Sequence, residues 1–349
     1  MKKLTRLIVT GATMCLCVAA AADDISGAGA TFPYPIYAKW ADSYKKLTGV
    51  VVNYQSIGSG GGIKQIKEKT VTFGASDMPL KPEDLKAAGL LQFPMIIGGV
   101  VPVVNVKGVQ PGQLRLDGAT VAAIYLGDIT QWNDPQIKRL NPTLALPGTA
   151  IAPVYRSDGS GTNFLFSDFL SKASPKFKSV IGANTSVQWP SGIGAKGNEG
   201  VANMTTQTDG AIGYVEYAYA KQNKMSYTLL TNKAGKAVAP GTESFQAAAA
   251  NADWVHSDSY YLILTDQDGA ASWPITGASF ILMYRQPANA KDAASANAAL
   301  KFFAWAYKDG ATMAAELDYV PLPAPLIMQV KKTWASEIMS GGRPVWSEQ

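Results

Sequence analysis

The stretch VVVNYQSIGSGGGIKQIKEKTVTFGASD, residues 50–77, alternates between strand-like and helix-like patterns. Residues 50–54 and 71–75 are short apolar and β-branched runs, which is typical of strands. Between them, Ile63 and Ile66 are spaced as on one face of a helix that follows the glycine-rich turn 58–62. Strand–helix alternation of this kind predicts an α/β architecture with mostly parallel sheets.

The same alternation continues along the chain. Further strand-like runs are residues 95–104, 151–155, 260–265 and 279–284, and helical spacing of apolar residues recurs within 36–47, 164–170, 300–307 and 326–334. Residues 171–200 are rich in Gly, Ser, Lys and Asn and predict long surface loops. The chain has 349 residues, more than a typical single domain, so we expect two lobes of about 150 residues.

The first 22 residues have the pattern of a cleavable secretory signal. Three cations lie within residues 2–6, an apolar run covers residues 7–18, and four alanines end at Ala22. The apolar run is shorter than the roughly 20 residues of a spanning helix, which argues against the alternative of an uncleaved anchor. Cleavage after Ala22 predicts an exported chain of 327 residues without Cys15 and Cys17, and a net charge that falls from +5 to +2. Such a charge argues against a nucleic-acid partner.

Three glycine-rich segments precede predicted helices: GAGATFP (27–33), GSGGG (58–62) and RSDGSGTN (156–163). Helix N-termini carry unpaired N–H groups and a partial positive charge, and glycine allows an anion to approach the backbone. None of the segments has the spacing of a P-loop or of a dinucleotide-binding turn. Three such helix starts indicate a shared anion site, although for each alone the hydroxyl residues also suit a simple N-cap.

Arg156 and Asp77 add charge to this pattern. A guanidinium offers a fixed fork of donors for a tetrahedral oxyanion, and Asp158 is placed either to orient that fork or to cap the next helix. Asp77 follows the strand-like run 71–75 and precedes Pro79, so an Asx turn is its alternative role. Near an anion, a carboxylate accepts the proton that phosphate retains at neutral pH, whereas sulfate has no such proton. The sequence therefore predicts a phosphate site that rejects sulfate.

The segments GAGATFPYPIY, NYQSIGSGGGIKQI, VTFGASDMPL and YRSDGSGTNFLF resemble the periplasmic phosphate-binding proteins of phosphate-importing ABC transporters. The likeness extends through GGVVPVVN, YLGDITQWNDPQI, GAIGYVEYAYA and WPITGASFILMY, almost the whole exported chain. It implies a two-lobed periplasmic-binding-protein fold (type II), each lobe a mixed sheet flanked by helices. It also implies high-affinity capture of inorganic phosphate in the periplasm, without chemistry or cofactor, by a monomer that delivers the ion to an inner-membrane permease.

The resemblance also implies a division of the chain and of the site. Residues 23–98 and 278–349 would form lobe I and residues 99–277 lobe II, with hinges in the segments 98–105 and 273–284. Lobe I would contribute Asp77 as proton acceptor and lobe II would contribute Arg156, supported by Asp158. The expected backbone and hydroxyl contacts to phosphate are those of Ala30, Thr31, Phe32, Ser59, Ser160, Gly161 and Thr162. The chain departs from the family pattern at Gly60, where Ser is frequent, and at Ser157, where Ala is frequent. Gly60 lacks a hydroxyl but keeps the backbone donor, so we expect little change there.

Three other functions fit the sequence less well. A secreted phosphatase needs a nucleophile or an activated water, but the one histidine, His256, belongs to no HExxH motif, and no serine lies in a G-x-S-x-G elbow. A binder of another oxyanion, such as sulfate or molybdate, would gain nothing from Asp77. An adhesion role would use some of the eight tryptophans, but Trp40, Trp305 and Trp334 lie on apolar helix faces and are expected in the core.

Overall fold

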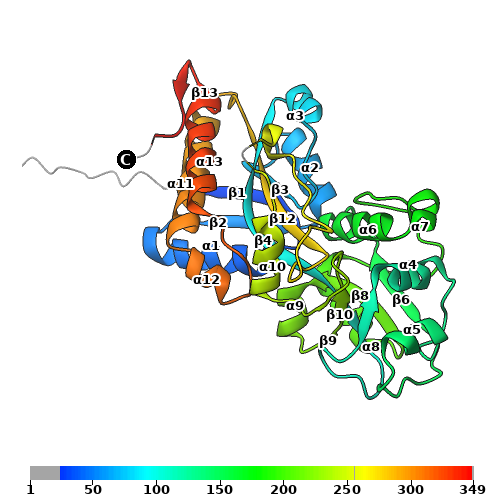
Figure 1. Ribbon diagram of the computed structural model, residues 1–349. Coiled ribbons are helices and arrows are strands. Elements are labelled where there is room, and N and C mark those ends of the chain that lie inside the picture. Colours follow the sequence, from blue (N-terminus) through cyan, green and yellow to red (C-terminus); the bar gives the residue numbers. More distant parts are fainter. Residues whose placement is uncertain (1–23, 255, 348–349) are drawn as a thin grey trace, which may run out of the picture.

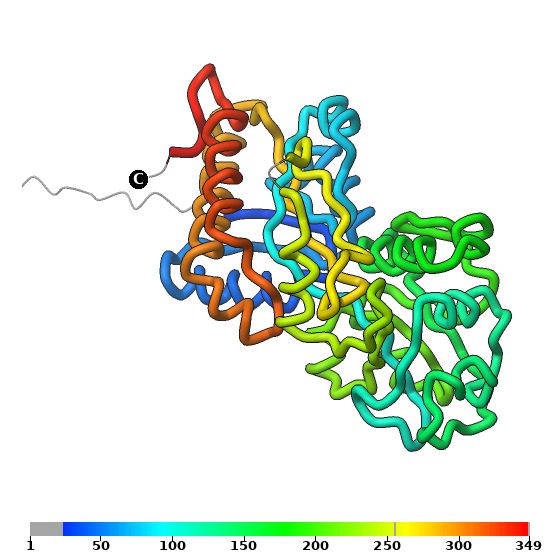
Figure 2. The backbone as a smooth tube through the Cα atoms, in the orientation of Figure 1, coloured from blue at the N-terminus to red at the C-terminus, as the bar shows by residue number. Residues whose placement is uncertain are grey.

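The computed structural model describes residues 24–254 and 256–347, and the predicted signal segment lies outside them. Two α/β lobes lie side by side (Figure 1). Lobe I is built around strands β1, β2, β3 and β12, and lobe II around β6, β7 and β8. The chain leaves lobe I in its cyan part and returns to it in its yellow part, so lobe I contains both ends of the described chain (Figure 2).

In lobe I, β1 (Ile25–Gly29) pairs in parallel with β2 (Val52–Ser56) and β3 (Phe73–Ser76). The sheet then changes direction, because β12 (Thr276–Tyr284) runs antiparallel to β3 and to β4 (Leu90–Val104). The surrounding helices are α1 (Tyr34–Thr48), α2 (Ser59–Lys67), α3 (Pro82–Ala88), α11 (Ala290–Lys308), α12 (Ala311–Ala315) and α13 (Ala324–Glu337). The sheet is thus mixed, as the family resemblance implies, rather than mostly parallel.

Strand β4 continues from lobe I into lobe II. Its residues 100–104 pair antiparallel with β8 (Ala211–Glu216), and β9 (Ser226–Tyr227) pairs with its end. Beyond β8 come β6 (Ala152–Arg156) and β7 (Ile193–Ala195), both parallel to their inner neighbours. The order across both lobes is β2-β1-β3-β12-β4-β8-β6-β7, so one continuous sheet path connects them.

The remaining elements cover these sheets or form small additions. Lobe II has helices α4 (Gly118–Leu126), α5 (Pro135–Leu140), α6 (Gly161–Ala173), α7 (Pro175–Val180), α8 (Gly197–Gln207) and α9 (Tyr217–Gln222). A small sheet joins β5 (Arg115–Asp117), β10 (Leu229–Thr231) and β11 (Ala237–Val238), and β13 (Met339–Ser340) pairs with β14 (Arg343–Pro344). Helix α10 (Thr242–Ala250) and the 3-10 turn η1 (Asp258–Tyr260) precede the return to lobe I.

Aromatic rings pack together in both lobes, within one continuous buried cluster. In lobe I, the Phe93 ring packs edge-on against Trp334 with ring centroids 5.0 Å apart. In lobe II, Phe166 stacks on Tyr214 with centroids 4.0 Å apart. The Tyr214 hydroxyl accepts the Arg156 backbone N–H at 3.1 Å and donates to the Asn163 side chain at 2.6 Å. This core therefore fixes the start of the glycine-rich segment that leads into α6.

Two sequence predictions were wrong. Residues 260–265 form no strand: Ser259 and Tyr260 have left-handed φ angles of 51° and 56°, and only Thr265 makes an isolated bridge, to Ile275. Residues 171–200 are not simply loops, because they contain α7 and β7 and the start of α8. Ser174 caps α7 by accepting the Phe177 N–H, and Pro175 at the first helical position favours the same start.

Among residues 24–254 and 256–347, no helix is long and apolar enough to cross a membrane.

Candidate binding site between the lobes

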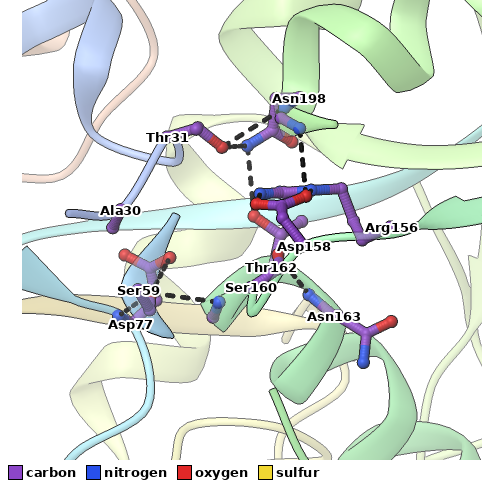
Figure 3. Close-up of polar contacts among 12 residues, drawn as sticks. Ala30, Thr31, Ser59, Asp77, Arg156, Asp158, Ser160, Thr162, Asn163 and Asn198 are labelled. Atoms are coloured by element: carbon purple, nitrogen blue, oxygen red, sulfur yellow. Dashed lines mark hydrogen bonds and ion pairs between the residues drawn. The ribbon is translucent and has the colours of Figure 1, made fainter. Parts of the chain in front are cut away.

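The three glycine-rich helix starts meet where the lobes touch. Ser59, the first residue of α2 in lobe I, accepts at its hydroxyl the backbone N–H of Gly161, the first residue of α6 in lobe II, at 3.0 Å. Thr31, which precedes α1, is linked to Thr162 of α6 through Asn198, whose side-chain nitrogen lies 2.6 Å and 3.1 Å from the two hydroxyl oxygens. Figure 3 shows these side chains around one region. The structure therefore brings together residues separated by more than 100 positions.

The hydroxyl groups at these helix starts differ in their hydrogen-bond partners. Ser160 is an ordinary N-cap, since its hydroxyl oxygen accepts the Asn163 N–H at 3.0 Å. Helices α1 and α2, by contrast, have no side-chain cap, and the hydroxyls of Thr31 and Ser59 make contacts across the lobe boundary instead. The simple capping role thus fits the third segment and does not explain the first two.

Arg156 ends β6 and is held by Asp158, two residues later. The guanidinium donates to both carboxylate oxygens, from Nε at 2.8 Å and from Nη2 at 2.6 Å, and the Arg156 side chain is only 1% exposed. Burial alone would raise the pKa of Asp158, but the Arg156 hydrogen bonds and charge, with the Gly197 N–H, lower it below its ordinary value. Asp158 therefore orients the fork. The remaining nitrogen, Nη1, is buried without a hydrogen-bond partner in the described chain.

Asp77 directly follows β3 and is 1% exposed. Its backbone N–H donates to the Ser59 hydroxyl at 3.2 Å, whereas its Oδ1 is buried without a partner in the described chain. Burial raises the pKa of Asp77 from 3.8 to about 7, against the opposing effects of the Ser279 hydroxyl, the Arg156 charge and the Ser59 hydroxyl. A buried polar group without a partner costs about 1–3 kcal/mol, and more if charged, so this carboxyl favours any arrangement that supplies a proton donor.

The raised pKa of Asp77 predicts a dependence of stability on pH. The native state keeps a proton that the unfolded chain loses near 3.8, so the stabilising contribution is complete below that pH and is lost as pH rises to about 7. The difference is at most about 4 kcal/mol. We expect that the free energy of unfolding of the ligand-free protein, measured by urea at pH 5, 6, 7 and 8, falls relative to that of Asp77→Asn. Parallel curves would contradict the assigned pKa.

The two lobes enclose these side chains. Ser59, Ser160 and Thr162 are 0% exposed, and Arg156 is 3% exposed. The backbone N–H of Gly60 donates to the Gly159 carbonyl at 2.9 Å, which is a direct bond between lobes. Gly58 has a φ of 87°, and a Cβ at this position would meet the Asp158 carboxylate. The structure is therefore a closed form, in which both lobes shield these side chains from solvent.

Ala30 and Phe32, both expected at the site, have polar groups that are partly engaged elsewhere. The Ala30 N–H donates to the Ala75 carbonyl at 3.0 Å and its carbonyl accepts from Tyr54, so Ala30 has no backbone donor left for a ligand. The Phe32 carbonyl accepts the Tyr319 hydroxyl at 2.6 Å, and its ring lies against Tyr319 in the core. Ala30 thus lines the region, whereas the backbone N–H of Phe32 is the group relevant to an anion.

Sequence reasoning missed Asn198, which connects Thr31 with Thr162. Asn198 is the second residue of α8 and is 0% exposed. A signal was present, because Gly197 precedes it with a φ of 72° and begins helix α8. That signal was weak, since the segment has no serine, threonine or arginine to suggest an anion.

Comparison with known proteins assigns the family. Residues 18–309 match the model of a PBP superfamily domain. A phosphate-binding protein PstS from Xylella fastidiosa is 56% identical over 90% of this chain and 85% of its own. The PstS of Haemophilus influenzae is 51% identical over 97% of this chain and 99% of its own. The chain belongs to the PstS family of phosphate-binding proteins.

The solved structures agree on the fold. A phosphate-binding protein from Stenotrophomonas maltophilia has a TM-score of 0.70 to this structure at 21% identity, covering 93% of this chain and 97% of its own. The two-lobed fold is therefore shared with a protein of very different sequence. At that identity the likeness concerns architecture alone, and the chemistry of the site rests on its own residues.

Proposed function

We propose that the protein captures hydrogen phosphate between its lobes and releases it unchanged to an importer. One observation carries the proposal: two oppositely charged groups, Asp77 and Arg156, each have a buried polar atom without a partner in the described chain. Arg156 Nη1 needs an acceptor and, as a carboxylate, Asp77 Oδ1 needs a donor. Hydrogen phosphate supplies both, because it has acceptor oxygens and one P–O–H group, whereas sulfate supplies only acceptors.

The other predicted residues take roles that fit their positions. Thr31 and Thr162 would donate through their hydroxyls, and Phe32, Ser59 and Thr162 through the backbone at the helix starts. Gly161 would close the site from lobe II, because its N–H already donates to the Ser59 hydroxyl, which in turn faces the Asp77 carboxylate. Ser160 would support the site by capping α6, and Asp158 by orienting Arg156. Ala30 would contribute packing alone. A dehydrated anion held by many neutral donors and one cation is stabilised without a metal or a cofactor.

We propose that residues 23–98 and 278–349 move as lobe I and residues 99–277 as lobe II. In support, β4 and β12 pair at the passage between the lobes, where Gly98 lies opposite Gly277. Glycine at such a crossing tolerates the changes in φ and ψ that closure needs. Tyr260 is an exception within the second range: its hydroxyl contacts Thr333 of α13 at 2.7 Å, so η1 is expected to move with lobe I.

Binding is proposed to occur without a chemical step. His256, the histidine of the phosphatase alternative, has a side chain that is 82% exposed and pairs with Asp253, whereas Ser160 is buried and caps α6. The family and the predicted signal segment support a monomer in the periplasm that delivers phosphate to the permease of an ABC importer. The near-neutral charge of the exported chain argues against a nucleic-acid partner.

Titration of the unfolded and refolded protein, freed of ligand, tests this function. We expect phosphate and arsenate to bind in a calorimeter at neutral pH, since both carry a proton there, and sulfate to bind far more weakly. At a free concentration of about 100 times its dissociation constant, phosphate would stabilise the fold by about 2.7 kcal/mol and raise the melting temperature. Equal affinity for sulfate and phosphate would overturn the proposal.

A further inference from the structure

Asn198 lies at the centre of a hydrogen-bond arrangement that involves both lobes. Its backbone N–H and its Nδ2 both donate to the Thr31 hydroxyl oxygen, at 3.2 Å and 2.6 Å. Nδ2 also donates to the Thr162 hydroxyl oxygen at 3.1 Å. The side-chain oxygen, Oδ1, accepts the backbone N–H of Glu216 at 2.9 Å. Every polar atom of the buried amide therefore has a partner.

The orientation of this amide follows from the Glu216 contact. A backbone N–H only donates, so the Asn198 atom that it reaches must be the oxygen. The nitrogen consequently faces the two threonines, and its two hydrogens are divided between them. No rotation of the amide by half a turn is compatible with the Glu216 N–H.

Counting protons then determines where both threonine hydroxyls point. The Thr31 oxygen receives two hydrogens from Asn198, which occupies both of its lone pairs. The Thr162 oxygen receives one. Neither hydroxyl is able to donate back to Asn198, because an amide nitrogen is not an acceptor. Both hydroxyl hydrogens are thus directed away from Asn198 and remain available to a ligand.

We propose that Asn198 is a positioning residue that fixes the hydroxyls of Thr31 and Thr162 as donors to phosphate. This inference rests on the proposed phosphate capture. Thr31 belongs to lobe I, whereas Asn198 and Thr162 belong to lobe II, so the arrangement is complete only when the lobes close. Donor orientation and closure are therefore coupled, and the coupling increases the preference of phosphate for the closed form. The residue also disfavours ligands that present hydrogens at these two positions.

A double-mutant cycle measured by phosphate calorimetry tests the role. We expect Asn198→Ala to weaken binding by about tenfold, because its loss leaves the hydroxyls free to rotate away from the ligand. In a Thr31→Val background the same change should cost less than about threefold, since only Thr162 is left to misorient. A purely structural role would give the same loss in both backgrounds. That additive result, or wild-type affinity of Asn198→Ala, would overturn the proposal.

Asn198→Asp is a second variant of nearly the same size. Its carboxylate still accepts the Glu216 N–H but accepts from the threonine hydroxyls instead of donating to them, and it adds negative charge. We expect a loss larger than that of Asn198→Ala, by a further factor of about ten. If Asn198→Ala does not fold, this variant tests the proposal alone, and a loss below about twofold would contradict it.

Tyr219→Phe serves as the matched control. The Tyr219 hydroxyl donates to the Thr31 carbonyl at 2.7 Å, so it also crosses the lobe boundary to the same residue but does not touch the hydroxyl. The effect of Tyr219→Phe on phosphate affinity should be the same with and without Thr31→Val. If Tyr219→Phe and Thr31→Val were coupled as strongly as Asn198→Ala and Thr31→Val, the role assigned to Asn198 would be overturned. If the wild-type protein itself showed no binding of phosphate in the calorimeter, that result would contradict the proposed function and not the role of Asn198.

Discussion

Replacing Gly161 by alanine is expected to weaken phosphate binding by about a hundredfold while leaving the ligand-free protein as stable as the wild type. A Cβ at this position would lie 2.5 Å from the Asp77 carboxylate and 2.6 Å from the Ser59 hydroxyl. Both neighbours belong to lobe I and are fixed by hydrogen bonds, so neither moves aside cheaply. Overpacking of this kind costs about 1–3 kcal/mol, and the hundredfold loss lies near the upper end of that range.

The expected loss is confined to the closed form. Gly161 is not among the residues with positive φ and starts α6, where alanine is a good helix former, so the backbone of an open form accepts the change. Calorimetry with phosphate and thermal melting without it separate the two effects. A fall in melting temperature without ligand would show that the substitution damages lobe II instead of blocking closure.

Gly60→Ala is the control for this experiment. It also lies at the lobe contact, but an added Cβ would be 3.1 Å from the nearest atom, Gly159 Cα, and small adjustments relieve that approach. We expect less than about a fivefold loss of affinity. Equal losses for Gly60→Ala and Gly161→Ala would contradict the view that Gly161 packs against the proton-accepting carboxylate.

Local sequence patterns predicted the elements better than their assembly. The apolar runs that became β2, β3, β4, β6 and β12 and the helices with clear apolar spacing were confirmed. Residues 260–265 do not form the predicted strand, because the segment is irregular and begins with left-handed backbone angles at Ser259 and Tyr260. Its apolar residues are buried or half-buried without strand pairing. The antiparallel insertion of β12 between β3 and β4 pairs segments about 200 residues apart, and no local pattern contains that information.

Part of the candidate site could be predicted because its signals are also local. Glycine, hydroxyl and charge at a helix start are local signals, so Ser59, Arg156 and Asp77 could be selected before their proximity was known. Asn198 carries no such signal, because a neutral amide that orients two hydroxyls is defined only by its contacts. The same holds for Ala30, whose N–H was expected at the ligand but bonds to Ala75 across the sheet.

At a pH where wild-type Asp77 is fully ionised, Asp77→Asn is expected to reduce the preference for phosphate over sulfate by at least about a thousandfold. In the wild type, ionised Asp77 facing sulfate is a buried charge without a donor, and mismatches of this kind reject ligands by 10⁴-fold or more on the order of magnitude. Asparagine has nearly the same size but offers an N–H group to either anion. Sulfate binding should therefore strengthen and phosphate binding weaken. Arg156→Ala is the control, because it removes a donor that both anions use and should weaken both alike.

The pH dependence of sulfate binding provides a sharper test of the same carboxyl. Burial raises the pKa of Asp77 to about 7, so lowering the pH through this value adds a proton and turns the repelling group into a donor. We expect the sulfate affinity of the wild type to rise by nearly tenfold for each pH unit as the pH falls towards about 7, and to level off below that value, where Asp77 is already protonated. Asp77→Asn should show no such slope, because its amide does not titrate. A wild-type slope that persists in the variant would place the discriminating proton on another residue.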